Sequence, residues 1–499
     1  MDLSRRFFIG SALSFTAFSG CRVFRAPGGL FSGAPKLKFG VVSDIHIMET
    51  AGDTGRQGDT KTFVHTLEWF RDQGVDAVMI AGDMADKGMV EQLQKVADAW
   101  FKVFPNNKAP DGRTVEKVFI YGNHDWEGAG YGGYAKKRFP NDAERPKHIL
   151  STDYKGNWER IFQEEYAPIY LKQIKGYSFI GHHWDGYGRS EKCSFDRIED
   201  FMSANGKKLD PALPFFYTQH PHPKDTCYGP WAWGHDSGVV TKTLSAFPNA
   251  IAFSGHSHYS LTDERSIWQD TFTSIGTSSL RYSGRTYDSR PPCGYENTGA
   301  AGNRDKIDPL KMMPIADPTD CRQGMLVSVY SDHITFARRE FLTNLFVGDD
   351  WVMPLPAAES KPYAFAVRKH KFRAPEFPSD AKLYVTRIKA TNRGGAGIPK
   401  TKKDAFKLAF PSAIAVKGAR PHEYEISIIP DKGEKKSKYV IATGYNHSIE
   451  SPKARKGDTC VIAADITPPD QPFHFEVVPL DFFWNAGKPL ASQKITRQG

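Results

Sequence analysis

The chain has 499 residues, which is enough for two or three domains with sizeable cores. Its composition is that of a soluble globular protein, and after residue 21 no apolar run reaches the roughly 18 residues that a membrane-spanning helix needs. The formal net charge is +9, but lysine and arginine are scattered in short clusters. We therefore expect no nucleic acid as a stable partner.

Residues 1–21 have the pattern of an export signal. Arg5 and Arg6 precede a short apolar stretch, as in twin-arginine signals, and Cys21 ends a segment that resembles a lipobox. We expect an exported protein, periplasmic or at the cell surface, attached to a membrane only through a lipid on Cys21. The alternative is an ordinary cleaved signal with an incidental cysteine. Residues 22–36 are expected to form a tether.

Strands and helices alternate in the next part of the chain. Five short apolar runs predict buried strands, and these are residues 39–43, 77–81, 117–120, 214–219 and 251–254. Residues 60–73 and 89–104 carry apolar side chains at helical spacing. A strand–helix–strand order at this spacing favours parallel neighbouring strands in an α/β domain.

Each of the five runs ends in polar side chains, at the strand end where open α/β sheets bind ligands. The polar residues are Asp44, His46, Asp83, Asn123, His220, His256 and His258. Aspartate, histidine and asparagine are ligands for divalent ions such as Mn, Fe, Zn or Co. Seven donors are too many for one ion but suit two, provided that one carboxylate bridges. Two ions about 3.5–4 Å apart can stabilise both the attacking and the leaving oxygen of a displacement at phosphorus.

The order of these blocks resembles the calcineurin-like metallophosphoesterase superfamily. The blocks are Asp-x-His, Gly-Asp, Gly-Asn-His-Asp, a lone His and Gly-His-x-His, and the resemblance covers residues 37–345. It implies an α/β fold, a β-sandwich of two mixed sheets flanked by helices. The resemblance also implies which donors share an ion: Asp44, His46 and His258 bind one, Asn123, His220 and His256 bind the other, and Asp83 bridges.

The same resemblance implies two catalytic residues. His124 would contact the phosphate and protonate the leaving group, and Asp125 would orient its imidazole. Purple acid phosphatases of this superfamily have a metal-bound tyrosine three residues after the bridging aspartate, whereas this chain has Asp86 there. The expected cofactor is therefore two divalent ions, Mn, Fe or Zn, and not a charge-transfer ferric site.

Three residues besides Asn123 and His124 are candidate substrate contacts. Tyr131 lies in a glycine-rich stretch, His182 follows a predicted strand, and Trp231 lies in an aromatic run after a metal-ligand candidate. Each has a structural alternative. Tyr131 would lie in a solvated connection, His182 would be a buried imidazole with its hydrogen bonds satisfied, and Trp231 would pack under a long loop.

Six cysteines are present, and setting Cys21 aside leaves five. An exported protein can form disulfides. Cys293 and Cys321 flank a glycine- and proline-rich insertion and are the best candidate pair, with Cys193 and Cys227 as the other. The connectivity stays open at the level of sequence.

The sequence changes character near residue 352. Prolines predict a linker over residues 346–362, and short alternating apolar runs then predict an all-β sandwich domain over residues 363–499. Two of these runs loosely resemble a fibronectin type III module, and none carries a catalytic pattern.

Together these features predict a metal-dependent hydrolase of phosphoester substrates, a monoesterase or a diesterase, in which a hydroxide bridging the metals attacks phosphorus. The alternative is a catalytically inactive surface binding protein with a phosphoesterase fold. The intact set of seven donors disfavours that alternative. The substrate and the oligomeric state stay open.

Overall fold

The structure is a computed structural model of the chain. It describes residues 33–50, 58–186, 194–227, 236–283, 321–391, 402–416, 420–442, 444–448, 450–451 and 457–498. The predicted export signal, the tether up to residue 32 and Trp231 lie outside these ranges. In the described part of the chain, no helix is long and apolar enough to cross a membrane.

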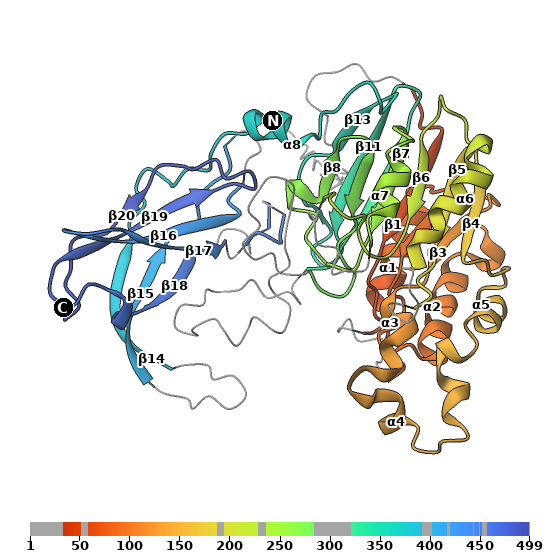
Figure 1. The fold of residues 1–499 in the computed structure, drawn as a ribbon, viewed down its shortest axis with the longest axis horizontal. Helices are drawn as coiled ribbons and strands as arrows, with labels where there is room; N and C mark the ends of the chain where they lie inside the picture. Colours follow the sequence, from red (N-terminus) through yellow and green to blue (C-terminus); the bar gives the residue numbers. More distant parts are fainter. Residues whose placement is uncertain are drawn as a thin grey trace, which may run out of the picture. The chain divides into compact units, whose positions relative to one another are not determined.

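Two mixed β-sheets form the centre of the larger domain (Figure 1). The first has seven strands in the order β12-β11-β10-β1-β2-β3, with β13 paired to β11. Its strands are β1 (Leu37–Val42), β2 (Ala77–Ala81), β3 (Glu116–Ile120), β10 (Gln323–Val329), β11 (His333–Glu340), β12 (Leu345–Phe346) and β13 (Trp351–Pro354). Strands β1, β2 and β3 are parallel, whereas β10 runs antiparallel to β1. The carboxyl ends of the three parallel strands therefore meet at one edge.

The second sheet has six strands in the order β4-β5-β6-β7-β9-β8. They are β4 (Ile169–Ile174), β5 (Tyr177–His182), β6 (Phe215–Thr218), β7 (Ala250–Ser254), β8 (Ile267–Gln269) and β9 (Thr273–Gly276). The four central strands are parallel, and β4 and β8 are antiparallel edge strands.

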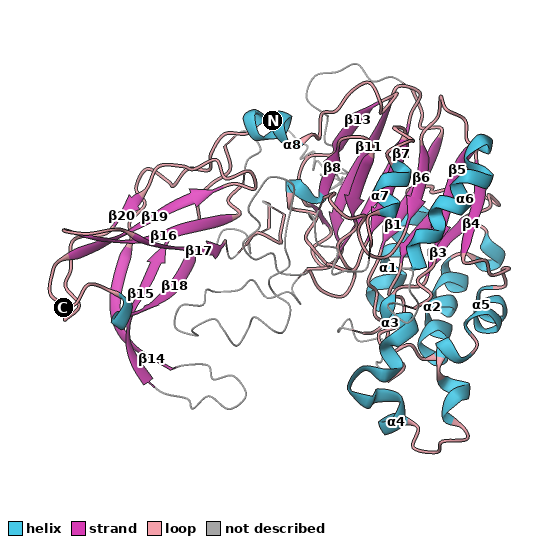
Figure 2. Cartoon of the chain, in the orientation of Figure 1, coloured by secondary structure: helices cyan, strands magenta, loops and turns pink. Residues whose placement is uncertain are grey.

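Side chains alternate between the two faces of each strand, so each sheet packs against the other sheet on one face and against helices on the other, in four layers. Figure 2 colours the helices cyan and the strands magenta. Phe39 and Val41 of β1 share a core with Phe179 and Phe216 of the second sheet, so the two sheets pack face to face. The outer face of the first sheet packs against α1 (Lys61–Asp72), α2 (Val90–Val103) and α5 (Tyr154–Phe162). The outer face of the second packs against α6 (Ile198–Asn205) and α7 (Val239–Leu244).

The C-terminal domain is all-β apart from short helical turns. Its two sheets have the orders β14-β15-β18 and β17-β16-β19-β20, and every pair is antiparallel. The strands are β14 (Tyr384–Thr391), β15 (Lys402–Phe410), β16 (Glu423–Pro430), β17 (Lys436–Ile441), β18 (Asp458–Ala463), β19 (Phe473–Leu480) and β20 (Leu490–Ala491). Phe406 and Leu408 of β15 share one core with Tyr424 and Ile426 of β16, which makes the domain a β-sandwich.

The fold class predicted from the sequence is confirmed. The glycine-rich stretch around Tyr131 forms a series of helical turns: α3 (Asn123–Glu127), a 3-10 segment over Gly128–Gly133 and α4 (Tyr134–Arg138). One detail differs from the expectations. The predicted linker, residues 346–362, contains β13, which extends the first sheet.

The predicted disulfides are wrong for this structure, because Cys227 and Cys321 are buried free thiols. Their proposed partners, Cys193 and Cys293, lie outside the described residues. The Cys321 thiol instead donates to the backbone carbonyl of Asn446, at 2.9 Å.

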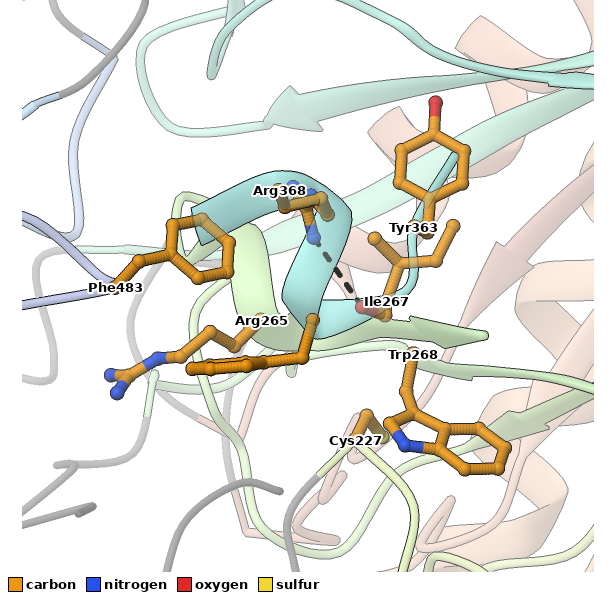
Figure 3. Close-up of a pocket in the computed structure, with 8 residues that line it drawn as sticks. Cys227, Arg265, Ile267, Trp268, Tyr363, Arg368 and Phe483 are labelled. Atoms are coloured by element: carbon orange, nitrogen blue, oxygen red, sulfur yellow. Dashed lines mark hydrogen bonds between the residues drawn. The ribbon is translucent and has the colours of Figure 1, made fainter. Parts of the chain in front are cut away.

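Helix α8 (Phe365–Lys371) joins the two domains through Arg368. This buried guanidinium forms an ion pair with Glu264. It also donates to the Ile267 carbonyl at 3.4 Å, the contact drawn as a dashed line in Figure 3. The pocket beside it, which Phe483 of the sandwich also lines, measures about 20 Å³. That volume accommodates a single water molecule, so this pocket is a packing defect and not a ligand site.

Candidate metal centre

Six of the seven predicted donors lie in loops after β1, β2, β6 and β7, and the seventh, Asn123, is the first residue of α3, shortly after β3. Five of them have left-handed backbone conformations: Asp44 (φ 51°), His46 (φ 51°), Asp83 (φ 55°), His256 (φ 68°) and His258 (φ 56°). Such φ values are unfavourable for residues with a Cβ and persist only where surrounding structure enforces them. The chain therefore accepts backbone strain at the positions from which the donor side chains converge.

The first group of donors is Asp44, His46 and His258. The Nε2 atoms of the two imidazoles lie 3.2 Å apart. Asp44 Oδ1 is 2.9 Å from His258 Nε2 and 3.7 Å from His46 Nε2. All three side chains are buried, so their ligand atoms face one another inside the protein.

The second group is Asp83, Asn123, His220 and His256. The centre of the group is His220 Nε2, which lies 3.1 Å from Asp83 Oδ2, 3.0 Å from Asn123 Oδ1 and 3.2 Å from His256 Nδ1. These residues are also buried.

Asp83 belongs to both groups. Its Oδ2 atom lies 3.1 Å from His220 Nε2 and 3.7 Å from His46 Nε2. Burial acts to raise the pKa of Asp83, but His220 and His124 outweigh it and lower the pKa to about 2. The reciprocal effect on His220 overcomes burial and raises its pKa to about 9. A single carboxylate oxygen thus stands between two sets of imidazole nitrogens.

The outer nitrogens of two of the imidazoles are hydrogen-bonded to backbone carbonyls. His220 Nδ1 is 2.7 Å from the Ala81 carbonyl, and His258 Nδ1 is 3.0 Å from the Tyr282 carbonyl. Since a carbonyl only accepts, each Nδ1 carries a proton, and Nε2 is the atom that would bind a metal ion, which His220 can do once it has lost its second proton. This is the tautomer that binds a metal through Nε2.

His46 is oriented by Asp86, a residue whose role here the sequence does not reveal. Asp86 Oδ1 lies 3.2 Å from His46 Nδ1, as a charge contact and not as an aligned hydrogen bond. The same carboxylate forms ion pairs with Arg281 and Lys87. In the sequence Asp86 is a charged residue three positions after Asp83, and this position alone does not identify its partner.

The structure corrects the predicted role of Asp125. Its carboxylate accepts hydrogen bonds from the backbone N–H groups of Met84, Ala85 and Gly122, at 3.2, 2.6 and 2.8 Å, and does not contact the imidazole of His124. Burial, aided by Asp83, raises the pKa of Asp125 to about 7. Asp125 therefore joins the loops after β2 and β3 and positions the site indirectly.

His124 is oriented by backbone instead. Its Nδ1 lies 2.8 Å from the Asp86 carbonyl, and its N–H donates to Asp83 Oδ1 at 2.8 Å. The ring is partly exposed, with 27% of the side chain accessible. Burial lowers its pKa to about 3, so the imidazole is neutral near pH 7 in the free protein.

The donor set fits divalent metal ions. Oxygen and imidazole ligands without a thiolate suit Mn, Fe or Zn. Four imidazoles and two carboxylates converge at 2.9–3.9 Å, and a cation can stabilise such a cluster of oxygen and nitrogen donors.

A comparison with known families decides the assignment. The sequence profile described as calcineurin-like phosphoesterase matches residues 37–260, which include all seven donors. Residues 37–260 are a calcineurin-like phosphoesterase domain. No curated protein sequence matches the chain significantly.

The solved structures that match this chain have low sequence identity to it. A purple acid phosphatase from yellow lupin is 12% identical, with 66% of this chain and 57% of that chain covered and a TM-score of 0.38. A phosphopantetheinyl hydrolase from Mycobacterium tuberculosis is 15% identical (50% and 91% covered, TM-score 0.30). A Vps29 protein complexed with Zn²⁺ from Entamoeba histolytica is 9% identical (64% and 99% covered, TM-score 0.27).

Two of the predicted substrate contacts, Tyr131 and His182, differ in their distance from the donor side chains and in their exposure. The Tyr131 hydroxyl accepts from Asn123 Nδ2 at 3.1 Å and also lines a hollow of about 590 Å³, with Lys136 and Arg145 on its wall. His182 is instead buried in the interior, with Nδ1 3.0 Å from the Tyr217 hydroxyl. The structure therefore brings Tyr131 to the site and places His182 among the core residues.

Proposed function

We propose that this chain hydrolyses phosphoesters with two divalent ions bound by the seven donors. The observation that carries the proposal is the position of Asp83, whose Oδ2 atom lies within 3.7 Å of an imidazole nitrogen of each donor group. A shared carboxylate is what a two-metal site requires, since it keeps the ions close enough to act on one phosphoryl group.

In this proposal, Asp44, His46 and His258 bind one ion, and Asn123, His220 and His256 bind the other. When bound, two such ions supply Lewis-acid stabilisation of the phosphoryl oxygens and lower the pKa of a water molecule.

The remaining steps belong to side chains beside the donors. His124 has Nδ1 committed to the Asp86 carbonyl, so Nε2 is the atom that would contact the phosphate and pass a proton to the leaving oxygen. A bound phosphate would favour that protonation, because a nearby negative charge raises the pKa of an imidazole. The hollow lined by Tyr131, Lys136 and Arg145 would accept the leaving group.

The proposal is tested with purified protein loaded with Mn²⁺, assayed on an aryl monoester, an aryl diester and an alkyl phosphoester. Asp83→Asn should lower the metal content and abolish hydrolysis while the melting temperature stays close to that of the wild type. The control is Asp72→Asn, which changes an exposed acid with 61% of its side chain accessible. It should leave both the metal content and the hydrolysis rate unchanged. A fully active Asp83→Asn protein with two bound ions would exclude the proposal.

The role of His124 is tested through the leaving group. His124→Gln should keep both ions and lose about 10²–10⁴-fold in rate on the alkyl ester, where the leaving oxygen needs a proton, and less on nitrophenyl esters. Equal losses on both substrates would assign His124 to charge stabilisation, and loss of an ion would make it a ligand.

We also propose export to the cell envelope with a lipid on Cys21, on the basis of the sequence pattern alone. Replacement of Arg5 and Arg6 by lysine should retain the precursor in the cytoplasm, and Cys21→Ser should abolish labelling with a fatty-acid probe. A wild-type protein without lipid would leave simple signal cleavage as the explanation.

A further inference from the structure

A second group of metal-binding side chains lies outside the phosphoesterase motif. Cys321, Glu340 and His447 each offer one ligand atom, and the three atoms lie within 4.8 Å of one another. All three residues are buried, with at most 3% of their surface accessible. Cys321 and Glu340 lie near the paired ends of β10 and β11, and His447 belongs to the β-sandwich domain.

The register of β10 and β11 explains why the first two residues meet. Gln323, the first residue of β10, pairs with Glu340, the last residue of β11. Cys321 lies two positions before Gln323, and the pairing continues past it, since the Phe341 N–H donates to the Arg322 carbonyl at 2.7 Å. Residues two positions apart share one face of a strand, so Cys321 and Glu340 are diagonal neighbours on the same face.

His447 reaches this face from a loop that follows β17. The Arg420 guanidinium fixes the loop by donating to the carbonyls of Gly444 and His447, at 3.1 and 2.5 Å. The Asn446 carbonyl accepts from both Cys321 Sγ and Gln323 Nε2, each at 2.9 Å. The loop of the sandwich domain is therefore docked on the end of β10.

The spacing of the ligand atoms fits a cation better than a hydrogen bond. His447 Nδ1 lies 3.3 and 3.5 Å from the two oxygens of Glu340, whereas a charge-assisted N–H···O bond measures about 2.7–2.9 Å. Two ligand atoms bound tetrahedrally at about 2.0–2.1 Å from zinc are about 3.4 Å apart. The observed separation equals the edge of such a tetrahedron.

Two buried polar groups beside the three ligand candidates have few or no hydrogen-bond partners. Among the described residues, the buried carboxylate of Glu340 has no hydrogen-bond partner other than His447. The side-chain oxygen of Asn446 is also buried and has no hydrogen-bond partner in the described structure. A buried carboxylate with one long contact is costly unless a cation compensates it.

We propose that Cys321, Glu340 and His447 bind a zinc-type transition-metal ion that joins the β-sandwich domain to the phosphoesterase sheet. Thiolate, carboxylate and imidazole are the three ligand types that zinc uses, and the Cys321 thiol releases its proton to solvent when the ion binds. Because the ligands are buried, the ion is structural and not a second catalytic centre.

Cobalt(II) is the probe that separates this site from the phosphoesterase centre. The seven donors there contain only nitrogen and oxygen, so a thiolate-to-cobalt charge-transfer band in the near ultraviolet arises only where a cysteine is a ligand. Full-length protein produced in cobalt-supplemented medium should show this band. Cys321→Ser should abolish it, whereas Cys460→Ser, which removes another buried thiol, should retain it.

Two further variants keep the test decisive if Cys321→Ser fails to fold. His447→Gln keeps the thiol but should raise the cobalt concentration needed for half of the band by about 100-fold or more. Asp83→Asn should keep the full band, since the inference does not depend on the proposed hydrolase function. Three results would each overturn the inference: no thiolate band in wild-type protein with excess cobalt, a band that persists in Cys321→Ser, or a disulfide on Cys321 in unreduced peptides.

Discussion

Gly255→Ala should damage the metal centre through a single methyl group. A Cβ atom at Gly255 would lie 2.4 Å from Asp44 Oδ2 and 2.7 Å from Ser43 Oγ. Since non-bonded heavy atoms settle at about 3.5 Å, Asp44 must move by about 1 Å. The Asp44 carboxylate has no free direction, because it accepts from Ser43 Oγ at 2.5 Å and from the His256 N–H at 3.1 Å.

A displacement of about 1 Å at a positioned catalytic group costs about 10²-fold in rate. We expect this loss in kcat/KM on an aryl phosphodiester, with a weaker affinity for Mn²⁺, and a stability loss of about 1–3 kcal/mol from overpacking. Hydrolysis rates, metal content and urea unfolding measure the three effects. Gly130→Ala is the matched control for metal content and stability, because its Cβ would have no neighbour within 4 Å. A Gly255→Ala enzyme with wild-type kcat/KM and two bound ions would refute the steric argument.

Three further predictions concern other parts of the chain. Asp86→Asn should weaken metal binding by about 10–100-fold in a Mn²⁺ titration, because His46 loses its charged partner, and unchanged affinity would show that this contact is incidental. Burial raises the pKa of Asp236 to about 6, whereas the unfolded value is about 3.9. Protonated Asp236 therefore adds to the free energy of unfolding below about pH 4, and this contribution is lost as the pH rises through 6. Asp236→Asn should therefore flatten this pH dependence of urea unfolding, worth roughly 3 kcal/mol, and an unchanged slope would argue against a buried carboxylate. Leu408→Ala should destabilise the β-sandwich by about 2–5 kcal/mol in the same assay, unless that core collapses around the missing side chain.

The sequence predicts much of the site because the pattern is local. Each donor directly follows the strand that positions it, so an apolar run and the polar residue after it place Asp83 at the end of β2 and His220 after β6. The partners of these donors are not local. Nothing in the run from Asp83 to Asp86 shows that Asp86 contacts His46, because that contact depends on how two loops pack.

The errors have the same physical origin. The family resemblance implied that Asp125 orients His124, but the Asp125 carboxylate accepts hydrogen bonds from three backbone N–H groups instead. Proximity to an insertion suggested a disulfide for Cys321, but the structure turns that thiol toward a loop more than a hundred residues away. In both cases, packing between segments that are distant in the sequence determines the partner of the side chain, and a local residue pattern does not predict that packing.

The most direct test of the metal-dependent phosphoesterase assignment is a crystal structure of the Mn²⁺-loaded chain with an anomalous difference map. We predict two peaks about 3.5–4 Å apart, with Asp83 bound to both. One peak should contact Asp44, His46 and His258, and the other should contact Asn123, His220 and His256. A map without peaks among these seven residues, from protein that hydrolyses phosphoesters in the same Mn²⁺ solution, would contradict the assignment.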